Sequence, residues 1–224
     1  MTVGFLTDGR AKKWGLSRAR WEERVLRACL IDPEELARSG ARLSKAFSRG
    51  QRVRITHSNG TDLELALNGS PPLVHDGRPH PKDKRFGPFG MLEQIPAGRV
   101  EVGLDPTIAE GSFHANRRTN IWWHVHAGGK LEFADGRLTS YSLDEGAEDF
   151  DRQYRSRVAG KDHVGRITLG LNPAATDIPN LEQIERGCVS LTVEDGTNFF
   201  SWFSLAGSEI AVDGTPVLRA GKLL

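Results

Sequence analysis

The sequence is poor in cysteine and contains no long apolar run. Only Cys29 and Cys188 occur among its 224 residues, which excludes a disulfide framework and a cysteine-rich zinc site. No apolar run reaches the roughly 18 residues that a membrane-spanning helix requires. The first residues, MTVGFLTDGRAKKWG, lack the apolar region of a signal peptide. We therefore expect a cytoplasmic protein without a membrane partner.

The chain also has almost no excess of positive over negative charge. The chain has 30 Lys and Arg against 29 Asp and Glu, a formal net charge of +1. Binding to nucleic acid requires a basic surplus on one face, so we expect no nucleic-acid partner. The content of 38% hydrophobic and 26% charged residues is that of an ordinary globular protein.

Two helices are predicted between residues 17 and 48. Trp21 and Val25 begin an apolar stripe at helical spacing, and Asp32-Pro33 is a typical helix start. Gly40 weakens the prediction that the second helix is continuous. The basic residues of these helices would face either an acidic partner or solvent, and we favour solvent because charge runs on helices are usually solvated. They are Arg18, Arg20, Arg24, Arg27, Arg38, Arg42, Lys45 and Arg49.

A β-hairpin follows the helices. Val53 and Ile55 alternate with polar residues, and Asn59-Gly60 is a strong turn signal before a returning strand. Residues 69–90 contain five Pro and four Gly and read as a loop. Its two histidines, His75 and His80, are expected to be surface residues without a metal role.

The remainder is predicted to be mostly β-structure, with a helix over 145–158 and a short helix over 181–186. The expected fold class is α+β. A helical N-terminal segment, 1–50, precedes a mixed, mostly antiparallel β-rich domain, 51–224. The expected strands are 99–104, 120–126, 129–134, 137–142, 165–171, 188–193, 199–205 and 209–212, with 216–218 as a further candidate.

Five stretches, in order, resemble the M29 family of metal-dependent aminopeptidases, which includes aminopeptidase T and PepS. They are VRITHSNGTDLELALNG, EQIPAGRVEVGLDPTIAEG, GGKLEFADGRL, HVGRITLGLNPAA and SEIAVDGTPVLRAGKLL. The resemblance covers about residues 30–224 and implies the β-rich domain of that family. It also implies dimers, and a larger α/β domain in full-length members that has few counterparts here.

The family resemblance implies a two-metal site of Glu, His and Asp ligands, but this chain carries other residues there. Arg99 and Arg166 stand where the family has Glu, and Ser190 stands at a His position. The family's His-x-Asp falls on Trp202-Phe203-Ser204. Arg offers no lone pair and repels a dication, and Trp supplies no ligand either, so we expect no inherited metal centre and no cofactor.

A relocated metal site is the alternative to this expectation. His124 and His126 stand at i and i+2 on a predicted strand, hence on one face, and His114, Glu132 or Asp135 could add a third donor. No motif marks that third ligand, so we favour a pair of partly exposed strand histidines beside Trp122 and Trp123. Neither Gly-x-Ser-x-Gly nor a phosphate-loop motif occurs in the sequence.

The leading hypothesis is a non-catalytic, peptide-binding protein. Arg99 and Arg166 would hold a carboxylate, with Ser190 beside them and Trp122, Trp123 and Trp202 as apolar walls. The chain is similar to the truncated PepS-like proteins of crocagin-type ribosomal peptide biosynthesis. That resemblance implies a precursor peptide as ligand, and a homodimer or a heterodimer with a related PepS-like protein.

Two other functions remain open. The first is a metal-dependent enzyme, either an aminopeptidase or an M29-like iron oxygenase, that uses His124 and His126. The second is a structural subunit that completes the active site of a partner.

Overall fold

A computed structural model gives the fold of the chain. It describes residues 2–3, 7–81, 84, 93–121, 124–156, 161–176, 178, 180–194 and 200–224. Trp122 and Trp123, two of the expected site residues, lie outside this part, as does Phe199.

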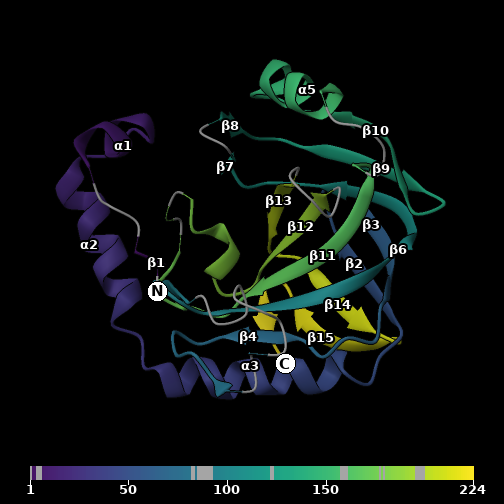
Figure 1. The fold of residues 1–224 in the computed structure, drawn as a ribbon, viewed down its shortest axis with the longest axis horizontal. Helices are drawn as coiled ribbons and strands as arrows, with labels where there is room; N and C mark the ends of the chain where they lie inside the picture. The colour runs from purple at the N-terminus through teal and green to yellow at the C-terminus, as the bar shows by residue number, and fades with distance from the viewer. Residues whose placement is uncertain are drawn as a thin grey trace.

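The chain begins with helices and continues as strands (Figure 1). The helices are α1 (Asp8–Lys13), α2 (Arg18–Cys29), α3 (Pro33–Phe47) and α5 (Ala147–Arg155), with a 3₁₀ turn, η2 (Glu182–Ile184). The first strands are β1 (Thr2–Val3), β2 (Arg52–His57), β3 (Thr61–Leu67), β4 (Leu73–His75), β5 (Gln94–Ile95), β6 (Arg99–His114), β7 (Thr119–Ile121) and β8 (His124–His126). The later strands are β9 (Lys130–Ala134), β10 (Arg137–Ser142), β11 (His163–Gly170), β12 (Cys188–Glu194), β13 (Phe200–Ala206), β14 (Glu209–Val212), β15 (Thr215–Arg219) and β16 (Lys222–Leu223).

One large antiparallel sheet organises the molecule. Its main path runs β13-β12-β11-β6-β3-β2-β14-β15-β16, and β4, β9 and β10 join beside it. β6 links the two halves, because residues 99–103 pair with β11 and residues 109–112 pair with β3. The parallel pair in the described part is short, formed by β1 and β5.

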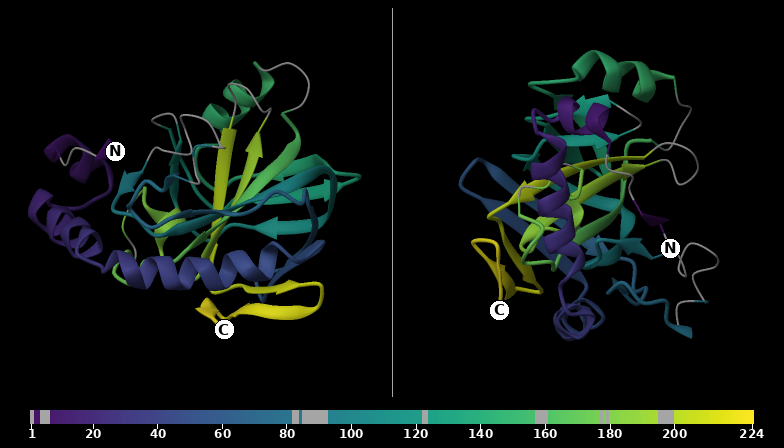
Figure 2. Two further views of the ribbon diagram at one scale, coloured as in Figure 1. Left: turned by 60° about the horizontal axis from the view of Figure 1, so that its bottom comes forward. Right: turned by 90° about the vertical axis from the view of Figure 1, so that its left-hand side faces the viewer.

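Helices cover the sheet from different sides. Figure 2 shows α3 running along one side of the strands, with α1 and α2 beyond one end and α5 on the opposite side from α3. Leu36, Leu43 and Phe47 of α3 join the same apolar core as the strands, and Phe150 brings α5 into it. None of the helices in the described part combines the length and apolar character that a membrane crossing requires.

The α+β class, with N-terminal helices before a mostly antiparallel sheet, is confirmed. Both predicted helices are present, with Ser17 and Asp32 accepting hydrogen bonds at their N-termini. α3 is continuous through Gly40, where a Cβ atom would lie 2.4 Å from the Cγ1 of Val74. Glycine at this position therefore lets α3 lie close against β4.

Several predicted boundaries were wrong. Residues 120–126 do not form one strand, because β7 and β8 pair with each other as a hairpin. β6 extends ten residues beyond the predicted 99–104. The prediction missed its second half because exposed polar residues and Pro106 interrupt the alternation of apolar and polar residues there. β4 lies inside the segment predicted to be a loop.

Asn172 joins three parts of the molecule. Its side chain is fully buried, and its Nδ2 donates to the carbonyl oxygens of Ala28 (2.9 Å) and Ala97 (2.8 Å). Its Oδ1 accepts from the backbone N–H of Ala174 at 3.0 Å. The residue therefore ties the end of α2 to the start of β6 and to its own loop.

We predict that Asn172→Ala lowers the free energy of unfolding by about 2–4 kcal/mol, because it leaves buried carbonyl groups without donors. Asn172→Asp should be at least as destabilising at pH 7, since it also buries a charge. Denaturant unfolding followed by circular dichroism measures both variants. A loss below about 0.5 kcal/mol for both would contradict this role.

Candidate functional site

One face of the sheet gathers the polar side chains of β4, β6, β11, β12 and β13. Because successive residues of a strand point to opposite faces, Ser190 and Thr192 of β12 share a face, while the apolar residues beside them point into the core. Ser190 lies opposite Thr168 on one side and Ser204 on the other. We call this surface the polar face. It contains His75, Arg99, Glu101, Arg166, Thr168, Ser190, Thr192, Glu194, Phe200, Trp202 and Ser204.

A carboxylate lies between the two arginines predicted for the site. Arg99 Nε donates to Glu101 Oε1 at 2.9 Å, and an Arg166 nitrogen lies 3.8 Å from Glu101 Oε2. Arg166 also donates to Glu194 at 3.0 Å. The side chain of Arg99 is 13% exposed and that of Arg166 is 40% exposed. The two guanidiniums are thus together, as expected, and both contact an acid of the chain itself.

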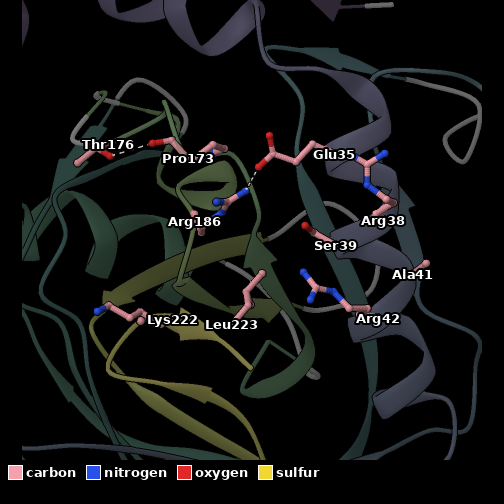
Figure 3. Close-up of a pocket in the computed structure, with 11 residues that line it drawn as sticks. Glu35, Arg38, Ser39, Ala41, Arg42, Pro173, Thr176, Arg186, Lys222 and Leu223 are labelled. Atoms are coloured by element: carbon pink, nitrogen blue, oxygen red, sulfur yellow. Dashed lines mark hydrogen bonds and ion pairs between the residues drawn. The ribbon is translucent and has the colours of Figure 1, made fainter.

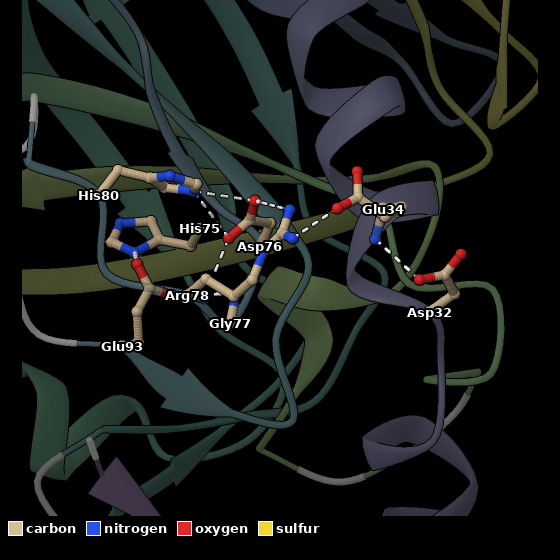
Figure 4. Close-up of polar contacts among 8 residues, drawn as sticks. All are labelled: Asp32, Glu34, His75, Asp76, Gly77, Arg78, His80 and Glu93. Atoms are coloured by element: carbon tan, nitrogen blue, oxygen red, sulfur yellow. Dashed lines mark hydrogen bonds and ion pairs between the residues drawn. The ribbon is translucent and has the colours of Figure 1, made fainter.

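His75 extends this charged cluster from β4. Its Nδ1 lies 3.2 Å from Glu93 Oε1, and its Nε2 lies 3.4 Å from Glu101 Oε1. Figure 4 shows His75 beside Glu93 and next to Asp76. His75 is buried, so the expectation that it is a surface loop residue was wrong. It lies on a strand whose register places it opposite Arg99.

The loop after β4 continues as a second set of ion pairs. Asp76 accepts from His80 Nε2 at 2.9 Å and from Arg78 at 3.2 Å. Arg78 also binds Glu34 at 2.6 Å, at the start of α3 (Figure 4). These contacts fix the loop that leads from His75 toward α3.

The cluster changes the ionisation of its members. Burial raises the pKa of Glu101, but the hydrogen bond to His75 and the charges of Arg99 and Arg166 outweigh it and hold that pKa far below its usual range. For His75, burial lowers the pKa, and the hydrogen bonds to Glu101 and Glu93 reverse this and raise it. The carboxylate of Glu101 is therefore ionised at neutral pH.

Ser190 and Trp202 lie on the polar face as the sequence predicts. Ser190 is fully buried and its hydroxyl forms a 2.7 Å hydrogen bond with that of Ser204. Trp202 lies two strands from Arg166, with Thr192 between them. Its ring stacks on Phe200 at 5.6 Å, and its Nε1 has no hydrogen-bond acceptor among the described residues. Phe203 points the other way, into the core.

The histidines of the alternative metal site lie elsewhere. His126, on β8, is buried with its ring 5.3 Å from that of Phe203 and 6.2 Å from that of Phe150. His114 lies on β6, with its Nδ1 2.8 Å from the carbonyl oxygen of Asn59. His126 is therefore buried in an aromatic part of the core, so the expectation that it is partly exposed was wrong. The side chain of His124 lies outside the description.

The residues of the polar face do not fit the two-metal site that the family resemblance implies. Two of the expected ligand positions hold guanidiniums, which supply no lone pair. Glu101, which contacts both guanidiniums, and Glu194, which contacts Arg166, are already bound by them. Within the described residues, no group of three His, Cys, Asp or Glu could hold a metal ion.

Sequence reasoning missed Glu101 and His75. The signal for Glu101 was present, because Arg99 and Glu101 are two residues apart on one strand and so share a face. For His75 the signal was weak, since β4 has three residues between prolines and glycines. Only its pairing with β6 brings His75 to the site.

A further buried acid lies on η2. Burial raises the pKa of Glu182 to about 8. Backbone hydrogen bonds to its carboxyl group, including one of 2.8 Å from the N–H of Asn180, offset part of this increase. Arg117 is paired with the neighbouring Glu185. Glu182 is therefore largely protonated at neutral pH.

We predict that Glu101→Gln lowers the free energy of unfolding at pH 7 by about 3 kcal/mol, because it leaves two guanidiniums without their carboxylate. Glu64→Gln, which breaks an exposed pair with Arg52, should cost less than about 1 kcal/mol. Because folding lowers the pKa of Glu101, its carboxylate stabilises the folded state fully only above the unfolded pKa of 4.5. The difference in stability between the wild type and Glu101→Gln should therefore shrink as the pH falls below 4.5. Equal losses for both variants would contradict the cluster's role.

The raised pKa of Glu182 gives the opposite pH dependence. Between pH 4.5 and about 8 the folded state binds more protons than the unfolded state, so this group lowers stability as the pH rises. Glu182→Gln should therefore raise the free energy of unfolding by about 1–3 kcal/mol at pH 8 and by little at pH 5. Denaturant unfolding at both pH values tests this, with the exposed Glu148→Gln as control. A gain that is equal at pH 5 and pH 8 would contradict it.

No protein-family profile and no curated protein sequence matches the chain, but solved structures do. The 2,5-dihydroxypyridine dioxygenase of Pseudomonas putida KT2440 aligns with a TM-score of 0.70 and 16% identity, over 90% of this chain and 62% of the dioxygenase. AmpT from Thermus thermophilus aligns with a TM-score of 0.69 and 17% identity, over 92% of this chain and 59% of AmpT. The chain thus spans less than two thirds of either protein. At this identity the likeness shows the fold alone: the chain has the M29-like fold of these two proteins.

Proposed function

We propose that the chain is a non-catalytic, peptide-binding protein that uses the polar face. One observation carries this proposal: Arg99 and Arg166 lie on either side of Glu101, with their nitrogens 2.9 and 3.8 Å from its oxygens. The pair already accommodates a carboxylate. A guanidinium is the side chain best suited to bind a carboxylate through two parallel hydrogen bonds.

Arg166 is the member of the pair that an incoming ligand would reach. Its side chain is 40% exposed, against 13% for Arg99. A carboxylate of a peptide, at its C-terminus or on an acidic side chain, would compete there with Glu101 and Glu194. Arg99 is held in place by Glu101 at 2.9 Å and by Gln94 at 3.2 Å. Its positive charge adds to that of Arg166 and attracts the same carboxylate.

The aromatic side of the polar face supplies an apolar contact. Phe200 and Trp202 stack with an interplanar angle of 11°, and a flat aromatic pair suits an aliphatic or aromatic side chain. The indole Nε1 of Trp202 is buried and has no acceptor among the described residues, so the contact with the ligand is made by the ring. Ser190 and Ser204, side by side on adjacent strands and both fully buried, do not reach the ligand.

The proposed ligand is the precursor peptide of a ribosomally made natural product, of the crocagin type. The chain would present its core to tailoring enzymes, as a homodimer or as a heterodimer with a related PepS-like protein. Support comes from the sequence resemblance and from guanidiniums at ligand positions. Capture from the native host, read by mass spectrometry, identifies the peptide and the partner.

A metal-dependent enzyme is the second candidate. The solved dioxygenase with the same fold favours it, in the form of an oxygenase or aminopeptidase that uses His124 and His126. The packing of His126 against Phe150 and Phe203 argues against it, because a buried ring among aromatic side chains leaves little room for an ion and a substrate.

We predict that Arg166→Ala weakens peptide binding by about 1.5–3 kcal/mol, the scale of a charged hydrogen bond, or roughly 10- to 100-fold in Kd. The probe is a pool of hexapeptides of randomised sequence with free C-termini, incubated with the immobilised protein. Retained peptides are quantified by mass spectrometry. The same pool with amidated C-termini shows whether the terminal carboxylate is the group that is held.

Arg20→Ala, an exposed arginine on α2, is the matched control and should leave retention unchanged. Equal retention by the wild-type and Arg166→Ala proteins would overturn the role of the polar face. Stoichiometric metal in elemental analysis, with turnover of aminopeptidase substrates in added Zn²⁺, Co²⁺ or Mn²⁺ that is lost in His124→Ala, would instead establish the enzyme.

A further inference from the structure

A second candidate binding site lies beside α3, away from the polar face. A hollow of about 970 Å³ is bounded by α3, by the loop after β11 and by β16, the last strand of the sheet. Figure 3 shows Glu35, Ser39 and Arg42 projecting from α3 toward Arg186 and Leu223 on the opposite side. We call this hollow the α3 groove.

The α3 groove has a strong positive charge for a chain that is nearly neutral overall. Four cationic side chains line it, Arg38, Arg42, Arg186 and Lys222, against the single carboxylate of Glu35. Glu35 is bound by Arg186 at 2.5 Å. In the described part of the chain, Arg38, Arg42 and Lys222 form no ion pair, so three positive charges face the hollow without a counter-charge.

The groove continues along the helix. A neighbouring hollow of about 450 Å³ shares Arg42 and adds Lys45 and Arg49 from later turns of α3 and its end. Its one carboxylate, that of Asp213, accepts from the backbone N–H groups of Gln51 and Arg52. Arg38, Arg42, Lys45 and Arg49 therefore form a basic stripe along the whole groove.

We propose that the α3 groove binds an acidic stretch of polypeptide in an extended conformation. Arg38 and Arg42 are four residues apart, about 6 Å along the helix axis, and acidic side chains on alternate residues of an extended strand are about 6.6 Å apart. The spacing of charges on the two partners therefore agrees. This site is independent of the polar face.

The wall opposite α3 favours a peptide over a nucleic acid. β16 is the last strand of the sheet and pairs only with β15 in the described part, so its outer edge is open to a further strand. Leu223 and Val217 add apolar contacts along this wall. A phosphate backbone could accept from the N–H groups of a strand edge, but it has no donors for the edge carbonyl groups and no apolar group for the aliphatic side chains.

The test is a fluorescence-anisotropy titration with a fluorescein-labelled octapeptide of alternating Glu and Val. We expect binding that weakens as salt rises, because it depends on exposed charges. Arg42→Glu on one wall and Lys222→Glu on the other should each weaken it at least tenfold. The peptide with Gln in place of Glu should bind at least tenfold more weakly to the wild-type protein.

Arg20→Glu is the matched control, since it changes the net charge by the same amount on α2, and it should alter the Kd by less than twofold. Because the polar face is itself proposed to bind carboxylates, the groove variants are also compared in the Arg166→Ala background, where the binding that remains belongs to the α3 groove. The proposal is overturned if the peptide does not bind or if the groove variants bind like the wild type. It is equally overturned if an eight-nucleotide single-stranded RNA or a phosphatidylserine vesicle binds more tightly than the peptide.

Discussion

The constraint on which the polar face depends is the need to neutralise charge that is withdrawn from water. Two guanidiniums and a buried imidazole stand on adjacent strands, and each would be costly there without an anion. Glu101 meets that need for all three, at 2.9 Å from Arg99, 3.8 Å from Arg166 and 3.4 Å from His75. The three strands β4, β6 and β11 are thus joined by side-chain charge as well as by backbone hydrogen bonds. Without Glu101, the positive charges on these three strands would repel one another.

Much of the fold could be predicted from local pattern alone. The spacing of Trp21 and Val25, the Asp32-Pro33 start and the Asn59-Gly60 turn report interactions between residues close in the sequence, and these elements appear as expected. What failed depends on distant pairing. β4 is a strand only because it pairs with β6, and Gly40 is compatible with a helix there because Val74 occupies the space of its missing side chain.

The candidate site likewise has residues that the sequence identified and partners that it did not. The resemblance to the M29 ligand positions placed Arg99, Arg166, Ser190 and Trp202 in one site, and the register of the strands puts them on one face. The partners of these residues were not predictable at that stage. Glu101 shares a strand with Arg99, but its contact with Arg166 requires the register between β6 and β11. His75 and Glu93 are buried together although they are separated by a segment of proline and glycine, and no periodic pattern spans that distance.

Because β2 lies between β3 and β14, one of its edges stays unpaired for most of the synthesis of the chain on the ribosome. β2 can pair with β3 as soon as that hairpin leaves the exit tunnel, but its other neighbour is β14. Gln51 and Asp213, which meet at that junction, are 162 residues apart. During this interval one side of β2 carries open backbone groups, a template for pairing with other nascent chains. Arg52 and Arg54 alternate with buried Val53 and Ile55 along β2, and charged side chains on an open edge strand oppose such contacts until β14 pairs with it.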